Sequence, residues 1–436
     1  MGRKVKILFL ILAAVMLLGG CAMKTVDELY SPPKRSAEYE DLQRAIDRAM
    51  PGLEYCAPLS GENQQTVQTA DLDGDGAAEY LLFAKGSAEK PLQILIFSRT
   101  DDGFGLKEVL ESKGSAFELV EYVNMDGKPG MELVVGRQVS DQILRSVSVY
   151  SFADGNAAQL MTANYSKFVT CDLNMDSLSE LMVITPGASE SDHAAAMLFS
   201  WEEDEMVRSR EADLSESADH IKRIMTGNLH EGIPAVYIAS SVEEKAIITD
   251  IFALRSGQFA NISLSNESGT SIQTLRNYYV YADDIDSDGV LELPSLMEMV
   301  YSNTQQYLIR WFAMDLRGRE VDKMYTFHNF ASGWYLQLDE AWAHRVSVVQ
   351  DGNSYVFSLW DEDFEETEKI MTVYVLTGSE REKAAAEKGW FLLHRGDEVI
   401  YAAQLETAAE SLGITQEIAV SRFHLIYQDW KTGETQ

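Results

Sequence analysis

Three acidic stretches recur along the chain, each nine residues long with oxygen-bearing side chains at positions one, three, five and nine. They are Asp71–Glu79 (loop one), Asp172–Glu180 (loop three) and Asp284–Glu292 (loop five). Clustered carboxylates repel one another unless a cation lies between them, and a hard divalent cation such as Ca²⁺ takes about 6–8 oxygen ligands. The spacing therefore predicts a calcium site in each of these loops.

An EF-hand would use similar residues, but the sequence departs from it. That motif needs a bidentate glutamate at position twelve and a helix after the loop. Position twelve is Leu82, Val183 or Ser295 here, and the residues that follow each loop have the apolar, β-prone composition of a strand. The loops are therefore expected to lie between strands.

The loops also mark a repeat. Two further segments, Asn124–Glu132 (loop two) and Gly227–Ala235 (loop four), fit the acidic pattern poorly but fall where it should recur, so the five loops begin at residues 71, 124, 172, 227 and 284. A period near 50 residues is typical of propeller blades, and each unit reads as strand, loop, strand, loop, strand, turn, strand. The predicted fold is mainly β: a β-propeller of about five four-stranded blades, with six as the alternative count.

These loops resemble the calcium loops of FG-GAP and VCBS-type repeats, the blades of integrin-like propellers, and the resemblance spans residues 63–325. It implies that side chains at positions one, three, five and nine and the carbonyl at position seven bind calcium. The implied ligands are Asp71, Asp73, Asp75, Ala77 and Glu79; Asp172, Asn174, Asp176, Leu178 and Glu180; and Asp284, Asp286, Asp288, Val290 and Glu292. Loop three has Ser177 where glycine would ease the turn. Loop two, with Lys128 and Pro129, and loop four are expected to be metal-free.

The N-terminus predicts export. A basic start (Arg3, Lys4 and Lys6) precedes the apolar run Ile7–Leu18, which is shorter than the roughly 20 residues that span a membrane. The next residues, Leu18-Gly19-Gly20-Cys21, resemble the lipobox of a bacterial lipoprotein signal; an ordinary signal peptide is the alternative. The resemblance implies a signal peptide over residues 1–21, a lipidated Cys21, and an anchor on the extracytoplasmic face of the cell membrane. Residues 22–62 are expected to form a tether and a helix from Ser36 to Met50.

Composition restricts the partners. The formal net charge of −33 argues against nucleic acid, whose phosphates require Lys and Arg, and against docking on anionic lipid by charge. Cys56 and Cys171 could pair in an oxidising compartment, but two free thiols are favoured because Cys171 lies on an expected core strand.

The period stops near residue 325, and residues 326–436 are expected to form a small α+β domain. Five of the seven tryptophans lie there: Trp334, Trp342, Trp360, Trp390 and Trp430. Tryptophans in such a domain are more often core residues than a ligand platform. The end of the chain, Gln416 to Tyr427, is expected to be helical.

No HExxH zinc motif, GxSxG elbow or P-loop occurs in the sequence. We therefore expect no catalysis, and a lipid-anchored, extracytoplasmic calcium-binding propeller protein that acts as a binding or scaffold module for an extracellular protein or glycan. The alternative is an enzyme that processes a cell-envelope polymer, with its site in the C-terminal domain.

Overall fold

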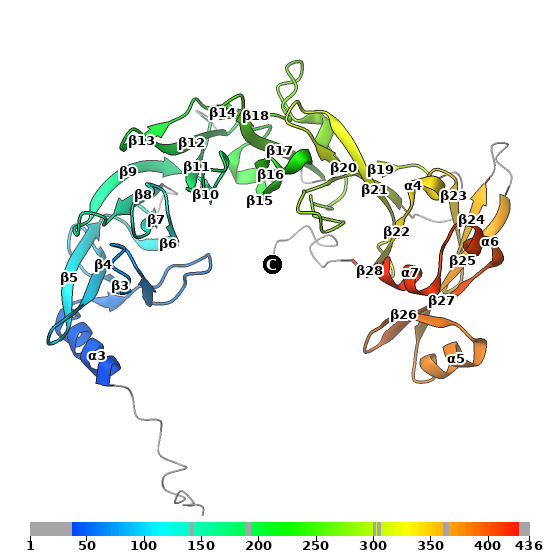
Figure 1. Cartoon of the computed structure of the whole chain (residues 1–436), viewed down its shortest axis with the longest axis horizontal. Helices are drawn as coiled ribbons and strands as arrows, with labels where there is room; N and C mark the ends of the chain where they lie inside the picture. The colour runs from blue at the N-terminus through cyan, green and yellow to red at the C-terminus, as the bar shows by residue number, and fades with distance from the viewer. Residues whose placement is uncertain are drawn as a thin grey trace, which may run out of the picture.

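The computed structural model describes residues 37–139, 144–187, 193–243, 245–299, 302, 307–360 and 366–426. The predicted signal peptide, Cys21 and the tether up to residue 36 lie outside these residues. The described chain forms six antiparallel sheets that follow one another in sequence order. Figure 1 shows them as an arc that runs from helix α3 (Ala37–Ala49) to strand β26 and helix α5. Of the described helices, none is both long and apolar enough to cross a membrane.

The first three sheets contain loops one to three. The first sheet comprises β1 (Glu54–Tyr55), β2 (Val67–Ala70), β3 (Glu79–Lys85), β4 (Leu92–Thr100) and β5 (Gly103–Ser112). The second comprises β6 (Ala116–Val123), β7 (Glu132–Gln138), β8 (Arg145–Ser151) and β9 (Ala158–Tyr165). The third comprises β10 (Lys167–Cys171), β11 (Glu180–Thr185), β12 (Ala195–Glu202), β13 (Glu205–Arg208) and β14 (Ala212–Asp213).

The last three sheets complete the arc. The fourth comprises β15 (Ile221–Asn228), β16 (Pro234–Val242), β17 (Ala246–Arg255) and β18 (Gln258–Asn261). The fifth comprises β19 (Leu293–Met297), β20 (Tyr307–Met314), β21 (Glu320–Asn329), β22 (Trp334–Leu338) and β28 (Phe423–Leu425). The sixth comprises β23 (Val346–Asp351), β24 (Ser354–Trp360), β25 (Glu366–Thr377), β26 (Phe391–Arg395) and β27 (Val399–Leu405).

Each sheet packs face to face on the next, so the core is a series of apolar layers between sheets. Leu81 and Phe83 of β3 pack with Val135 of β7, and Val183 of β11 packs with Val134 on the other face of β7. A central strand of such a sheet is buried on both faces, which explains why β3, β11 and β16 are continuous apolar runs rather than alternating ones. Helix α3 covers the outer face of the first sheet through Leu42 and Ile46.

The expected mainly β chain of antiparallel sheets is confirmed, and the five loops of the repeat fall in the first five sheets. Strand β19, which contains Pro294, lies at the edge of its sheet, where a missing N–H is tolerated. Among the described residues no closed propeller is found: β1 pairs with β3 and β28 with β22, so no strand joins the two ends of the arc. Cys56 and Cys171 are both free thiols, as favoured from the sequence.

The C-terminal region differs in detail from the expectation. The boundary placed between residues 325 and 326 falls inside β21, and the fifth sheet takes β22 and β28 from beyond it. The helix expected over Gln416–Tyr427 is wrong in its second half, because α7 (Gln416–Ser421) ends and β28 follows. Extended backbone there places Phe423 against Trp334, with ring centroids 5.4 Å apart.

The remaining α-helices lie in this region, where α4 contacts β21 of the fifth sheet and α5, α6 and α7 contact strands of the sixth. They are α4 (Glu340–Ala343), α5 (Arg381–Lys388) and α6 (Thr407–Ser411), together with α7. Trp334 and Trp342 are buried in the core between the fifth and sixth sheets, in line with the expectation that tryptophans here form core.

Candidate metal centres

The ninth residue of four loops is a buried glutamate with the same role. Glu79, Glu132, Glu180 and Glu292 are each at most 3% exposed. Each begins a strand or directly precedes one, and one of its carboxylate oxygens accepts the backbone N–H of the loop's second residue at 2.6–3.2 Å. The buried glutamate therefore joins the end of the loop to its second residue.

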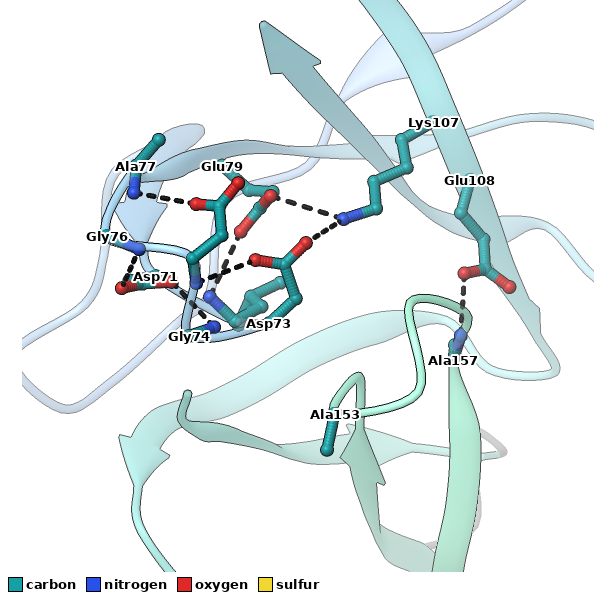
Figure 2. Close-up of polar contacts among 12 residues, drawn as sticks. Asp71, Asp73, Gly74, Gly76, Ala77, Glu79, Lys107, Glu108, Ala153 and Ala157 are labelled. Carbon is teal, nitrogen blue, oxygen red and sulfur yellow. Dashed lines mark hydrogen bonds and ion pairs between the residues drawn. The ribbon is translucent and has the colours of Figure 1, made fainter. Parts of the chain in front are cut away.

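Loop one folds around its own carboxylates (Figure 2). Asp71 accepts the N–H groups of Gly74 at 2.8 Å and Gly76 at 3.1 Å, and Asp75 accepts the N–H of Ala77 at 2.7 Å. Gly74 and Gly76 have φ of +72° and +87°, a left-handed backbone that glycine adopts without strain. These bonds turn the carboxylates of Asp71, Asp73 and Glu79 toward one another.

Loops three and five repeat this geometry. In loop three, Asp172 accepts the N–H groups of Met175 and Ser177 at 2.8 and 3.0 Å, although both residues have positive φ without being glycine. In loop five, Asp284 accepts the N–H groups of Asp288 and Gly289, each at 2.9 Å. The same bend is therefore built from three different sequences.

Three groups of carboxylates result, each with one ligand atom per residue within 4.8 Å of the others. They are Asp71, Asp73 and Glu79; Asp172, Asp176 and Glu180; and Asp284, Asp286 and Glu292. Each group could hold a metal ion. Of the other predicted ligands, Asp75 and Asp288 lie outside these groups, and they accept the N–H groups of Ala77 and Val290. Asp176, which belongs to its group, also accepts the N–H of Leu178. Asn174 donates its amide to Asp176 at 2.9 Å.

The electrostatics of loop five favour a bound cation. Glu292 is fully buried, and its Oε1 has no hydrogen-bond partner. Burial, with Asp286 and Asp288 nearby, raises its pKa to about 8. In loop three, burial and the neighbouring carboxylates raise the pKa of Glu180 to about 7. A divalent cation would relieve both the lost hydration and the repulsion.

Two lysines contact carboxylates of the acidic loops, and sequence reasoning missed both. The Nζ of Lys107 lies 2.5 Å from Asp73 Oδ2 and 3.3 Å from Glu79 Oε1, and Lys323 forms an ion pair with Asp288. Burial opposes ionisation of Asp73, but the hydrogen bond and charge of Lys107, together with backbone N–H donors in the loop, outweigh burial and lower the pKa of that carboxyl. The hydrogen bond from Lys323 likewise lowers the pKa of Asp288.

Both lysines occupy the same place in their sheets. Lys107 is the extra residue of a β-bulge between β4 and β5, where Phe97 pairs with Leu106 and Ile96 with Glu108. Lys323 is the extra residue of the corresponding bulge between β20 and β21. A bulge re-aims the side chain of its extra residue, and here it directs an ammonium group at the loop. Residue spacing from the loop gave no signal for this contact.

Each loop also bonds to the loop of a neighbouring sheet. The N–H of Met131 in loop two donates to the carbonyl of Asp71 at 3.1 Å, and the N–H of Ser179 in loop three donates to that of Asn124 at 2.7 Å. Between loops four and five, the N–H of Leu291 donates to the carbonyl of Asn228 at 2.9 Å. Figure 2 shows a further link, in which Glu108 of β5 accepts the N–H of Ala157 in the second sheet at 2.8 Å.

Loops two and four differ from the acidic loops. In loop two, the ammonium of Lys128 is 3.8 Å from Asp126 and lies over the ring of Trp201, 5.4 Å from its centroid. In loop four, the amide of Asn228 donates to the carbonyl of Gly289 at 2.7 Å. Loop four therefore braces loop five.

No protein-family model matches the chain, and no curated protein matches it. Among solved structures it is similar to the rhamnogalacturonan lyase YesW, with a TM-score of 0.32 and 11% identity over 67% of this chain and 57% of that chain. It is also similar to the exotype rhamnogalacturonan lyase YesX, with a TM-score of 0.30 and 10% identity over 69% of this chain and 74% of that chain. A third similar structure is a Bacillus licheniformis rhamnogalacturonan lyase, with a TM-score of 0.31 and 12% identity over 68% of this chain and 66% of that chain. The chain thus spans 57% of the length of YesW, and a likeness this low carries no argument about fold or activity.

Proposed function

We propose that this protein is a calcium-binding, extracytoplasmic binding or scaffold module, anchored to the cell membrane through lipid on Cys21. Its first five sheets, which contain loops one to five, would act as propeller-like blades, and calcium in loops one, three and five would hold their spacing.

One observation carries the proposal: carboxylates cluster at the same position of the first, third and fifth sheets, and each of these loops is bonded to the loop of an adjacent sheet. A cation in such a loop would fix both the loop and its contact with the neighbouring sheet. The oxygen-only donor set suits a hard cation, and calcium accepts the irregular geometry that magnesium does not. The unpartnered, buried Oε1 of Glu292 supports the assignment in loop five.

The stability that bound calcium would add indicates a structural role for the ion. If calcium is present at ten times the dissociation constant, one site adds about 1.4 kcal/mol to the free energy of unfolding, and three independent sites add about 4 kcal/mol. That is a substantial share of the roughly 5–15 kcal/mol that stabilises a typical domain. Calcium would therefore hold the array of sheets in one conformation. A module that presents a binding surface to a partner requires such a fixed conformation.

Thermal unfolding with and without calcium tests the metal assignment. Replacing Asp73 and Asp286 by alanine together should lower the melting temperature in calcium and shrink the gain that calcium gives. The matched control replaces Asp102 and Asp154 by alanine, which removes the same charge from exposed turns outside the clusters. An equal calcium-dependent gain in both double variants would remove loops one and five from the assignment.

The binding role is tested on the whole chain, because β22 and β28 belong to the fifth sheet and a cut at residue 325 would divide β21. A glycan array and a protein-binding screen should identify a ligand, and cell-envelope polymers should remain intact on incubation. Turnover of such a polymer that is abolished by one acidic substitution in the C-terminal region would favour the enzyme instead. For the anchor, incorporation of labelled palmitate should be lost in Cys21→Ser.

A further inference from the structure

The third sheet lacks the lysine that contacts the acidic loop in the first and fifth sheets. Phe97, Phe199 and Phe312 occupy the same position, each paired with the residue that follows its loop. Beyond Phe97 and Phe312 the outer strand bulges at Lys107 and Lys323. Beyond Phe199, β13 ends at Arg208, and the next residue is Ser209.

Ser209 does not reach the loop. Its Oγ accepts the N–H of Leu198 at 2.9 Å and donates to the carbonyl of Arg210, also at 2.9 Å. Among the described residues, no lysine, arginine or histidine forms an ion pair with a carboxylate of loop three. The negative charge of this loop is therefore left without the internal counter-ion that loops one and five possess.

A cavity of about 510 Å³ opens against loop three, between the third sheet and the β17–β18 hairpin of the fourth. Asp176 and Glu180 of loop three line it, with Glu202 at the end of β12. Arg210 is the one cationic residue in this lining. Three carboxylates against one guanidinium make the cavity unsuited to an anion and suited to a cationic group.

The walls of the cavity suit a long aliphatic side chain. Val207, Leu254 and Phe259 contribute apolar surface. A lysine side chain buries its methylene groups along such surface while its ammonium reaches a polar partner. Trp201, which also lines the cavity, has the ammonium of Lys128 over its ring, which shows that this indole accepts a cation.

We propose that this cavity binds an alkylammonium group from outside the chain, the side chain of a lysine on a partner protein. The external ammonium takes the place that Lys107 and Lys323 take in the first and fifth sheets. The inference deepens the binding role proposed above. Calcium in loop three would neutralise Asp176 and Glu180, so calcium and the lysine compete for the same carboxylates.

Calorimetric titration in calcium-free buffer with a chelator tests the proposal separately from the calcium assignment. The probes are Nα-acetyl-lysine methylamide and its neutral isostere, Nα-acetyl-norleucine methylamide. We expect the lysine probe to bind with a dissociation constant on the order of 1 mM and the norleucine probe to bind at least tenfold more weakly. Equal affinity for the two probes would overturn the proposal.

Two variants localise the binding. Ser209→Lys supplies the internal ammonium at the equivalent position and should abolish binding of the lysine probe. Ser87→Lys, at an exposed position in the loop between β3 and β4, makes the same change of charge and should leave binding unchanged. If Ser209→Lys does not fold, the exposed Glu202→Gln serves in its place and should weaken binding at least threefold. Binding of undiminished affinity in the folded Ser209→Lys protein, or in Glu202→Gln where that variant is used, would place the probe elsewhere and refute the proposal.

Discussion

Replacement of Lys107 by methionine should strengthen calcium binding at loop one. The ammonium lies 2.5 Å from Asp73 Oδ2 and 3.3 Å from Glu79 Oε1, so it neutralises carboxylates that calcium would otherwise bind. Methionine keeps an aliphatic side chain of similar length without the charge. Loop one would then resemble loop three, which has no lysine contact.

The magnitude follows from the geometry. Calcium–oxygen distances are about 2.4 Å, so an ion on Asp73 would lie roughly 5 Å from an ammonium that contacts the same carboxylate. Charges of +2 and +1 at that separation repel by about 1.7 kcal/mol at the dielectric constant of water, and the lower effective dielectric constant near a protein surface makes the repulsion larger. Relief of this repulsion corresponds to a gain in affinity of at least about tenfold. Without calcium, loss of the charge-assisted hydrogen bonds should lower the free energy of unfolding by about 2 kcal/mol.

The assay is calorimetric calcium titration in a background where Asp176→Ala and Asp286→Ala silence loops three and five. Lys113→Met is the matched control, because Lys113 lies just beyond β5 with its side chain 63% exposed and pairs only with Glu89 among the ion pairs of the described residues. A dissociation constant for Lys107→Met that equals or exceeds that of Lys113→Met would refute the reasoning that the lysine competes with calcium.

Two further perturbations test the packing of loop one and the core of the fifth sheet. In urea unfolding, Gly74→Ala should lower the free energy of unfolding by about 1–3 kcal/mol more than Gly76→Ala. Both positions have positive φ, but only at Gly74 would the new Cβ meet a neighbour, Pro129 Cβ at 2.3 Å. Equal losses in the two variants would contradict the close contact of loops one and two. Burial lowers the pKa of His328 to about 3, so the folded protein binds fewer protons than the unfolded chain between pH 6.5 and 3, and the stability associated with neutral His328 is lost as the pH falls through this window. The difference in free energy of unfolding between the native protein and His328→Gln should therefore shrink by about 2–3 kcal/mol from pH 6.5 to 4.5, and a constant difference would show that His328 is not held neutral.

The carboxylate clusters could be predicted from the sequence because they are local. Nine consecutive residues contain the three carboxylates, and the backbone bonds that gather them, such as Gly74 to Asp71, lie within the same nine residues. The strands that follow were equally visible, since a strand buried on both faces is a continuous apolar run. The structure confirms the carboxylate groups and the mainly β architecture. The identity of the ion stays a prediction.

The features that the sequence did not reveal depend on distant pairing. Lys107 reaches loop one because a bulge in the pairing of β4 with β5 redirects it, and no pattern within β5 announces a bulge. Phe423 belongs to a strand because Trp334, far away in the sequence, offers it a partner, whereas the local composition favours helix. Closure of a ring is likewise a property of both ends of the chain together, and the period of the loops carries no information about it.

The alternation of the loops has a physical reason. A loop with three carboxylates carries charge that an identical neighbour would repel, and in this array the neighbour is never identical: loop two, with Asn124 and Lys128, separates loop one from loop three. Loop four replaces the carboxylates at positions one, three and nine altogether and gives loop five an amide donor through Asn228. The weakly acidic loops are therefore spacers that supply backbone and amide partners and carry less negative charge than the acidic loops. If loop two were made acidic by Asn124→Asp and Lys128→Asp, calcium-free stability should fall and the gain from calcium should grow, because repulsion between adjacent loops would then have to be relieved by the ion. Unfolding experiments in chelator and in calcium would show this, and an unchanged calcium-free stability would mean that the loops are too well screened from one another for charge to have set their order.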